Sequence, residues 1–77
     1  MSGTNTDRAA NRMQQRVALN VLAFREHHGF SQDQLAQLAG IDRKTVNRIE
    51  NGHFSPSIDT LTRLSVALGI EISKLLK

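Results

Sequence analysis

Apolar residues recur along most of this chain at intervals of three or four, the spacing of one buried face on an α-helix. The pattern predicts a first helix that starts at about Asp7 or Asn11 and is stopped by Gly29. Its apolar face comprises Met13, Val17, Val21 and Phe24. The small polar residues of 1–10 can bury little, so we expect a flexible polar tail ahead of one helical domain over residues 11–77.

Helix-start signals mark a second helix that begins after Ser31 and ends at Gly40. Ser31 is a preferred N-cap residue, and Gln34 three residues later completes a capping box. Phe30, directly before the cap, is expected to pack on Leu35 as a hydrophobic staple. Gly40 can adopt the left-handed backbone conformation that ends a helix, so we expect a tight turn there.

A third helix follows at once, with Asp42 as its expected cap and Asn51-Gly52 at its end. Val46 and Ile49 lie about one turn apart and should face the core. The whole pattern comprises Gln32, Leu35, Ala36, Gly40, Val46 and Ile49. This spacing is typical of a helix-turn-helix, in which two short helices cross over a tight turn.

Two further helices complete the expected fold. Ser57 after Pro56 predicts the start of a fourth helix, which Gly69 closes. Its expected buried stripe comprises Ile58, Leu61, Leu64 and Leu68. Residues 70–76 fit a short fifth helix with Glu71, a poor capping residue, at its cap position. Its expected anchors are Ile72, Leu75 and Leu76. The sequence therefore predicts a compact all-α domain of five helices.

Composition narrows the classes of function. A chain of 77 residues has room for one small core, and the absence of cysteine excludes disulfides and cysteine metal sites. His27 and His28 are adjacent and point apart on a helix, while His53 lies in a loop, so we expect no metal and no cofactor. We find no catalytic triad or paired carboxylates and expect no enzyme. Without a long apolar run or signal segment, a cytoplasmic protein is expected.

The exposed face of the predicted third helix carries the candidate chemistry. It comprises Arg43, Lys44, Asn47, Arg48 and Asn51. A helix with a polar, basic face fits the DNA major groove, and the net charge of +3 suits a polyanion. Arg43 and Lys44 are candidates for guanine, Asn47 for adenine, and Arg48 for a base or a phosphate. From the charge pattern alone, a solvated helix face remains an equal alternative.

Three stretches of the sequence resemble the phage-repressor-like helix-turn-helix family, of the Cro/cI or XRE type. They are "FREHHGFSQDQLAQLAG", "IDRKTVNRIENG" and "PSIDTLTRLSVALGIEISKLL". The resemblance covers residues from about 17 to 76. It implies a five-helix, lambda-repressor-like domain that binds double-stranded operator DNA, usually as a homodimer.

The resemblance also implies roles for single residues. Gln32 and Asn51 are expected to contact DNA phosphates, although Asn51 is alternatively a helix C-cap. Ser55 and Ser57 are further candidate phosphate contacts. Arg25 and Glu50 are expected to form a largely buried salt bridge that holds the third helix; the alternative is two unrelated surface charges.

The sequence alone does not decide the roles of two surfaces. Arg8, Arg12 and Arg16 share one helix face, which either reaches DNA or is simply solvated. Several apolar residues fall outside the main stripes, and small members of the resembled family pair through their C-terminal helices. We therefore expect a dimer surface at Val66, Ile70, Ile72 and Leu76. Leu19 and Leu22 belong to a dimer surface, pack on the N-terminal segment or are ordinary exposed residues.

These observations predict a DNA-binding transcriptional regulator, by default a repressor. A homodimer would place two recognition helices about 34 Å apart on a pseudo-palindromic operator. Two alternatives remain: a DNA-binding antitoxin whose main partner is a protein, and a protein-interaction module that no longer contacts DNA. The basic residues of the third helix argue against the second alternative.

Overall fold

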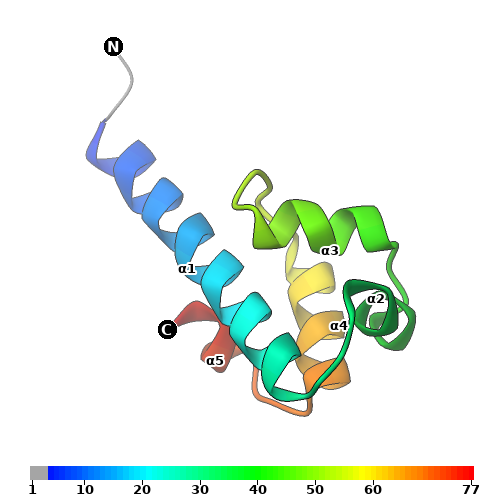
Figure 1. The fold of residues 1–77 in the computed structure, drawn as a ribbon. Helices are drawn as coiled ribbons and strands as arrows, with labels where there is room; N and C mark the ends of the chain where they lie inside the picture. The colour runs from blue at the N-terminus through cyan, green and yellow to red at the C-terminus, as the bar shows by residue number, and fades with distance from the viewer. Residues whose placement is uncertain (1–3) are drawn as a thin grey trace.

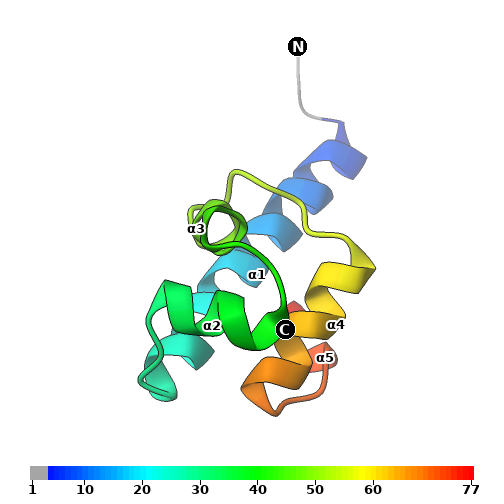
Figure 2. The ribbon, with the colours of Figure 1, turned by 90° about the vertical axis from the view of Figure 1, so that its right-hand side faces the viewer.

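A computed structural model describes residues 4–77 of the chain. It shows helices joined by short loops (Figure 1). Five helices and no strands occur in this range: α1 (Asn5–His27), α2 (Gln32–Ala39), α3 (Arg43–Glu50), α4 (Ile58–Leu68) and α5 (Ser73–Leu76). α2 packs against α3 and α4, while α1 packs against α3 and α5. Figure 2 views α3 nearly along its axis, with α2, α4 and α1 arranged around it. The expected all-α architecture is confirmed.

The first helix begins earlier than expected. Thr4 is its N-cap, and the Thr4 hydroxyl accepts a hydrogen bond of 3.0 Å from the Asp7 backbone N–H. The predicted polar tail is therefore wrong for residues 5–10, which are helical, while residues 1–3 lie outside the described range. The N-terminal half of α1 projects beyond the other helices (Figure 1). Met13, predicted to be in the core, is 40% exposed and borders a surface pocket beside Leu61 and Leu76.

The signals at the starts of α2, α3 and α4 are confirmed. Ser31 and Gln34 form both bonds of the capping box at the start of α2. Asp42 caps α3 by accepting a bond of 2.8 Å from the Thr45 N–H, and Ser57 caps α4. These caps satisfy N–H groups that have no partner within the helix, and so they set where each helix begins.

One core brings all five helices together. Its buried members are Val17, Val21, Leu35, Ala36, Ala39, Val46, Ile49, Leu61, Leu64, Leu68 and Leu75. Ile58, predicted to belong to this core, is 73% exposed. Ile58 lies on the same side of α4 as Thr62 and Val66, which are also exposed. The buried stripe of α4 therefore starts at Leu61.

The last helix is shorter than predicted. α5 begins at Ser73, and its N-cap is Ile72 rather than Glu71, with no side-chain hydrogen bond at the cap. Only Leu75 of its expected anchors is fully buried, while Ile72 and Leu76 are half-buried against the core. The Asn20 side-chain amide donates 2.9 Å to the Leu75 carbonyl and joins α5 to α1. Burial of Leu75 and this bond to its carbonyl, rather than a side-chain cap, therefore hold α5 in place.

Candidate nucleic-acid interface

The turn between α2 and α3 presents one face of α3 to solvent. Gly40 has a φ of 70°, the left-handed conformation that the sequence predicted. The Ile41 N–H then bonds to the Ala36 carbonyl at 3.0 Å and closes the turn. Val46 and Ile49 are fully buried, so the opposite side of α3 must face outward. The tight turn at Gly40 and the burial of one face of α3 together give the helix-turn-helix geometry.

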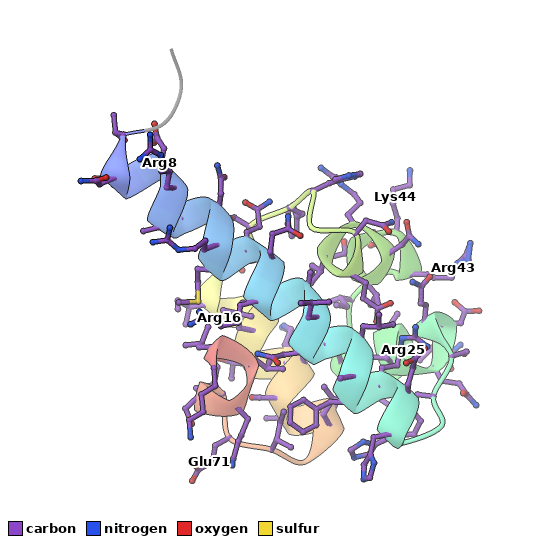
Figure 3. All side chains as sticks on the ribbon, turned by 60° about the vertical axis from the view of Figure 1, so that its left-hand side comes forward. Arg8, Arg16, Arg25, Arg43, Lys44 and Glu71 are labelled. Atoms are coloured by element: carbon purple, nitrogen blue, oxygen red, sulfur yellow. The ribbon has the colours of Figure 1, made fainter. Side chains whose placement is uncertain are left out.

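The candidate base-reading residues lie on the outward face. Arg43, Lys44, Asn47 and Arg48 are all exposed. Figure 3 shows Arg43 and Lys44 pointing away from the helical body, at one end of α3. Asp42, which caps this end, is also exposed, and hydrogen bonding from the Thr45 side chain and backbone lowers the pKa of its carboxyl group. The exposed first turn of α3 therefore carries two cationic side chains, Arg43 and Lys44.

The expected pair of Arg25 and Glu50 is formed, and it joins α1 to α3. The Arg25 Nε donates to Glu50 Oε2 at 2.6 Å and its Nη2 to Oε1 at 3.0 Å. The side chains are only 14% and 5% exposed, respectively. The hydrogen bond to Glu50 raises the pKa of the Arg25 guanidinium above its ordinary value. Arg25 Nη1 also donates 2.8 Å to the Phe30 carbonyl, so one cation holds α1, the next loop and α3 together.

A chain of side-chain amides leads from this pair to the exposed face. Gln32, the first residue of α2, donates from Nε2 to Glu50 Oε1 at 3.0 Å. Asn47 Nδ2 donates to Gln32 Oε1 at 3.3 Å, and Asn51 Nδ2 donates to Asn47 Oδ1 at 3.0 Å. Asn51 is also the C-cap residue of α3. The sequence does not reveal these bonds, because Gln32 and Asn47 meet only through the crossing of α2 and α3.

Arg48 has a partner that the sequence did not reveal. Its guanidinium lies over the ring of Phe54, 5.1 Å from the ring centroid. Phe54 belongs to the loop between α3 and α4 and is half-buried against the core. A guanidinium stacked on a ring keeps its N–H edge free for other contacts. The only signal in the sequence was a lone aromatic residue in a polar loop.

The α3–α4 loop is held from α1. Gln14 and Gln15 both donate side-chain N–H groups to the Gly52 carbonyl, at 3.1 and 3.4 Å. Of the candidate phosphate contacts in this region, Ser55 is exposed, whereas the Ser57 hydroxyl is engaged in capping α4. The position of the loop beside α3 is therefore defined by contacts with α1 and by the cap of α4.

The remaining charged candidates are the three arginines that share one face of α1. Arg8, Arg12 and Arg16 are exposed on α1, with Arg8 near its projecting end (Figure 3). Across residues 4–77, no helix has the length and apolarity needed to cross a membrane. Within the same range, histidines and carboxylates form no group of three that could hold a metal ion.

The apolar residues outside the core also differ in exposure. Val66 is 75% exposed, whereas Ile70, Ile72 and Leu76 are half-buried against the chain's own core. Leu19 is exposed and Leu22 half-buried. Residues 5–10 continue the same helix away from these two leucines, so the leucines do not pack on that segment.

Comparison with known proteins places this geometry in a family. A family model described as helix-turn-helix matches residues 21–75. A hypothetical transcription factor of Neisseria meningitidis is 32% identical over 60 residues, which cover 78% of this chain and 57% of that protein. Control protein C.SmaI of Serratia marcescens is 33% identical over 60 residues, covering 78% of this chain and 71% of that protein.

Comparison with solved structures finds the same fold in a related protein. The crystal structure of the restriction-modification controller protein C.AhdI from Aeromonas hydrophila superposes with a TM-score of 0.78 at 32% identity. The superposition covers 80% of this chain and 94% of that chain. The match to the Neisseria protein, in contrast, spans less than two thirds of that relative's length.

Proposed function

Since this chain belongs to the helix-turn-helix family of XRE-type transcriptional regulators, we propose that it binds a pseudo-palindromic operator as a homodimer and represses transcription. The observation that carries the proposal is the outward face of α3. Arg43, Lys44, Asn47 and Arg48 are exposed there, on a helix whose other face is buried and tied to α1 by a salt bridge. A rigid, basic helix face suits the width and charge of the major groove.

The proposed contacts follow from position along α3. Arg43 and Lys44 lie in the first turn and would reach guanine O6 and N7, while Asn47, one turn later, would reach adenine. Arg48 stands beside the α3–α4 loop and would reach a base or a phosphate. The proposed phosphate contacts are Gln32, Asn51, Ser55 and Ser57. Gln32 and Ser57 lie at helix N-termini, where the helix dipole favours an anion.

The proposed dimer surface is the outer ridge of α4. Ile58, Thr62 and Val66 follow one another at steps of four and are all exposed. Two of them, Ile58 and Val66, are the most exposed large apolar residues in the described range. Residues at this spacing form a continuous ridge that can pack against a second helix. Ile70, Ile72 and Leu76, which are half-buried, would then border the interface.

Site selection from a random DNA duplex pool at near-physiological salt tests DNA reading. A two-fold symmetric enriched site is expected. Arg43→Ala should then weaken binding to that site by about 1–3 kcal/mol and relax the preference at one base position. Arg63→Ala, which removes an exposed arginine on α4, is the matched control and should leave the preference unchanged. Binding without any enrichment, lost steeply with salt, would contradict sequence-specific regulation.

Sedimentation of the free protein tests the dimer. Val66→Lys should shift the protein from dimer to monomer, because a charge would be buried in the interface. Leu38→Lys, at another exposed apolar residue on α2, is the control and should leave the dimer intact. A dimer that survives Val66→Lys would place the interface elsewhere. A stable complex with a second protein in place of the dimer would favour an antitoxin.

A further inference from the structure

The buried Glu50 carboxylate dictates how the Gln32 amide is turned. Glu50 Oε1 accepts hydrogen bonds from Arg25 Nη2 and from Gln32 Nε2, both at 3.0 Å. An ionised carboxylate has no hydrogen to donate, so only the NH₂ end of the Gln32 amide can face it. The carbonyl end, Oε1, must then point the other way, toward α3. An amide in solvent has no such constraint and can present either end.

The orientation of the Gln32 amide in turn fixes the orientation of the Asn47 amide on the exposed face of α3. Because Gln32 presents its oxygen, Asn47 must present its NH₂ group, and Asn47 Nδ2 donates to Gln32 Oε1 at 3.3 Å. The Asn47 carbonyl oxygen is thereby turned toward Asn51, whose Nδ2 donates to it at 3.0 Å. The order of donors and acceptors thus runs in one direction, from a buried charge to the surface.

We propose that Gln32 is a positioning residue that selects adenine through Asn47, an inference that rests on the proposed function. After these bonds, Asn47 keeps one free N–H and one free oxygen lone pair on its amide. This donor–acceptor pair is complementary to adenine N7 and N6 in the major groove. With its amide held in one orientation, Asn47 offers that pair in a fixed order, and less entropy is lost on binding.

A simple phosphate contact by Gln32 predicts different behaviour. Both polar atoms of the Gln32 side chain are already engaged with Glu50 and Asn47, which leaves one N–H for a phosphate. A phosphate contact carries no sequence information, so its loss weakens binding to every duplex alike. Loss of a positioning residue instead weakens discrimination at one base pair. Base preference therefore separates the two roles.

Gln32→Met is the decisive variant, because methionine keeps the length of the side chain and removes both hydrogen bonds. Its matched control is Gln37→Met, on the exposed side of the same helix. Affinity is measured by fluorescence anisotropy for the selected operator and for operators altered at its adenines. Gln32→Met should lower the preference for one adenine about fivefold, the equivalent of about one net hydrogen bond. Gln37→Met should keep it.

A double-mutant cycle gives the sharper result. If Gln32 acts through Asn47, the Gln32→Met/Asn47→Ala double variant should discriminate no worse than Asn47→Ala alone. Additive losses, or an equal loss of affinity for all duplexes, would overturn the positioning role. Far-UV circular dichroism on each variant shows that the helices are retained.

The free protein provides a second readout that needs no DNA. The side-chain amide resonances of Asn47 in ¹⁵N-labelled protein should shift in Gln32→Met and stay in place in Gln37→Met. Resonances that do not move would overturn the relay, even if an operator is selected. A wild-type protein that enriches no site while the Asn47 resonances do shift would overturn the proposed function, and with it the role of Gln32 in base choice.

Discussion

Replacing Arg25 by methionine tests what holds α3 in place. Methionine retains an unbranched apolar stem but removes the guanidinium that donates two hydrogen bonds to Glu50 and one to the Phe30 carbonyl. The Glu50 carboxylate, whose side chain is 5% exposed, then keeps Gln32 as its remaining donor. An almost fully buried charge is left without its counter-ion.

The expected loss is large for a chain of this size. Removing one partner of a buried ion pair costs about 3–5 kcal/mol of unfolding free energy. Since Arg25 is 14% exposed and Gln32 still donates to the carboxylate, we expect about 3 kcal/mol. A domain of 77 residues has about 4–12 kcal/mol in total, so the variant loses a quarter or more of its stability. The melting temperature should fall by more than about 10 °C.

Urea unfolding followed by far-UV circular dichroism measures this loss. Helical dichroism is the suitable signal, because the chain contains neither Trp nor Tyr. Protomer concentration is held constant, since dimerisation would add to the apparent stability. Arg63→Met is the control: it breaks the Arg63–Asp59 pair, whose side chains are 49% and 77% exposed, and should cost less than about 1 kcal/mol.

Two results would refute the reasoning. If Arg25→Met costs no more than Arg63→Met, the Arg25–Glu50 pair behaves as a surface ion pair and does not hold α3. The Arg25→Met/Glu50→Met double variant should recover most of the loss, because no charge is then left buried. A double variant as unstable as the single one would show that packing by Arg25, rather than the stranded carboxylate, is responsible.

Three further predictions concern the ends of α3. Phe54→Leu removes the ring under Arg48 and should weaken operator binding about two- to fivefold by anisotropy, but not in an Arg48→Ala background. The pKa of Asp42 is lowered by folding, so its contribution to stability is present above its unfolded pKa and is lost as pH falls through its folded pKa. Asp42→Asn keeps the cap, and its urea midpoint should therefore fall less than that of wild type between neutral and acid pH. Gly52→Ala places a Cβ 2.5 Å from Gln15 Nε2 at a φ of 72° and should cost at least about 1–2 kcal/mol in urea unfolding. A Gly52→Ala loss near zero would mean that the loop relaxes into another conformation.

Local signals were sufficient to predict most helix boundaries. Ser31, Asp42 and Ser57 supply side-chain acceptors for free N–H groups, and these interactions span only three residues. The same signal is present at Thr4, three residues before Asp7, although the polar composition of residues 1–10 favours a tail. The start of α1 was therefore predictable in principle.

Burial was less predictable than helix position. Periodicity shows which residues share a face, but it does not show how far the neighbouring helices extend along that face. Met13 and Ile58 follow the correct spacing, yet Met13 borders a surface pocket beside Leu61 and Leu76, and Ile58 lies on the exposed side of α4. Their exposure depends on the lengths and crossing angles of other elements, which the local pattern does not contain.

The sequence by itself determined the helices, the turn at Gly40 and the exposed basic face of α3, because caps, glycine conformation and helical period act over a few neighbouring residues. It also carried a family resemblance that led to the Arg25–Glu50 pair. Only the tertiary structure decided the contacts from Glu50 through Gln32 to Asn47, and the stacking of Arg48 on Phe54. Those contacts join different helices and loops, so they exist only once the helices have packed at specific angles and distances.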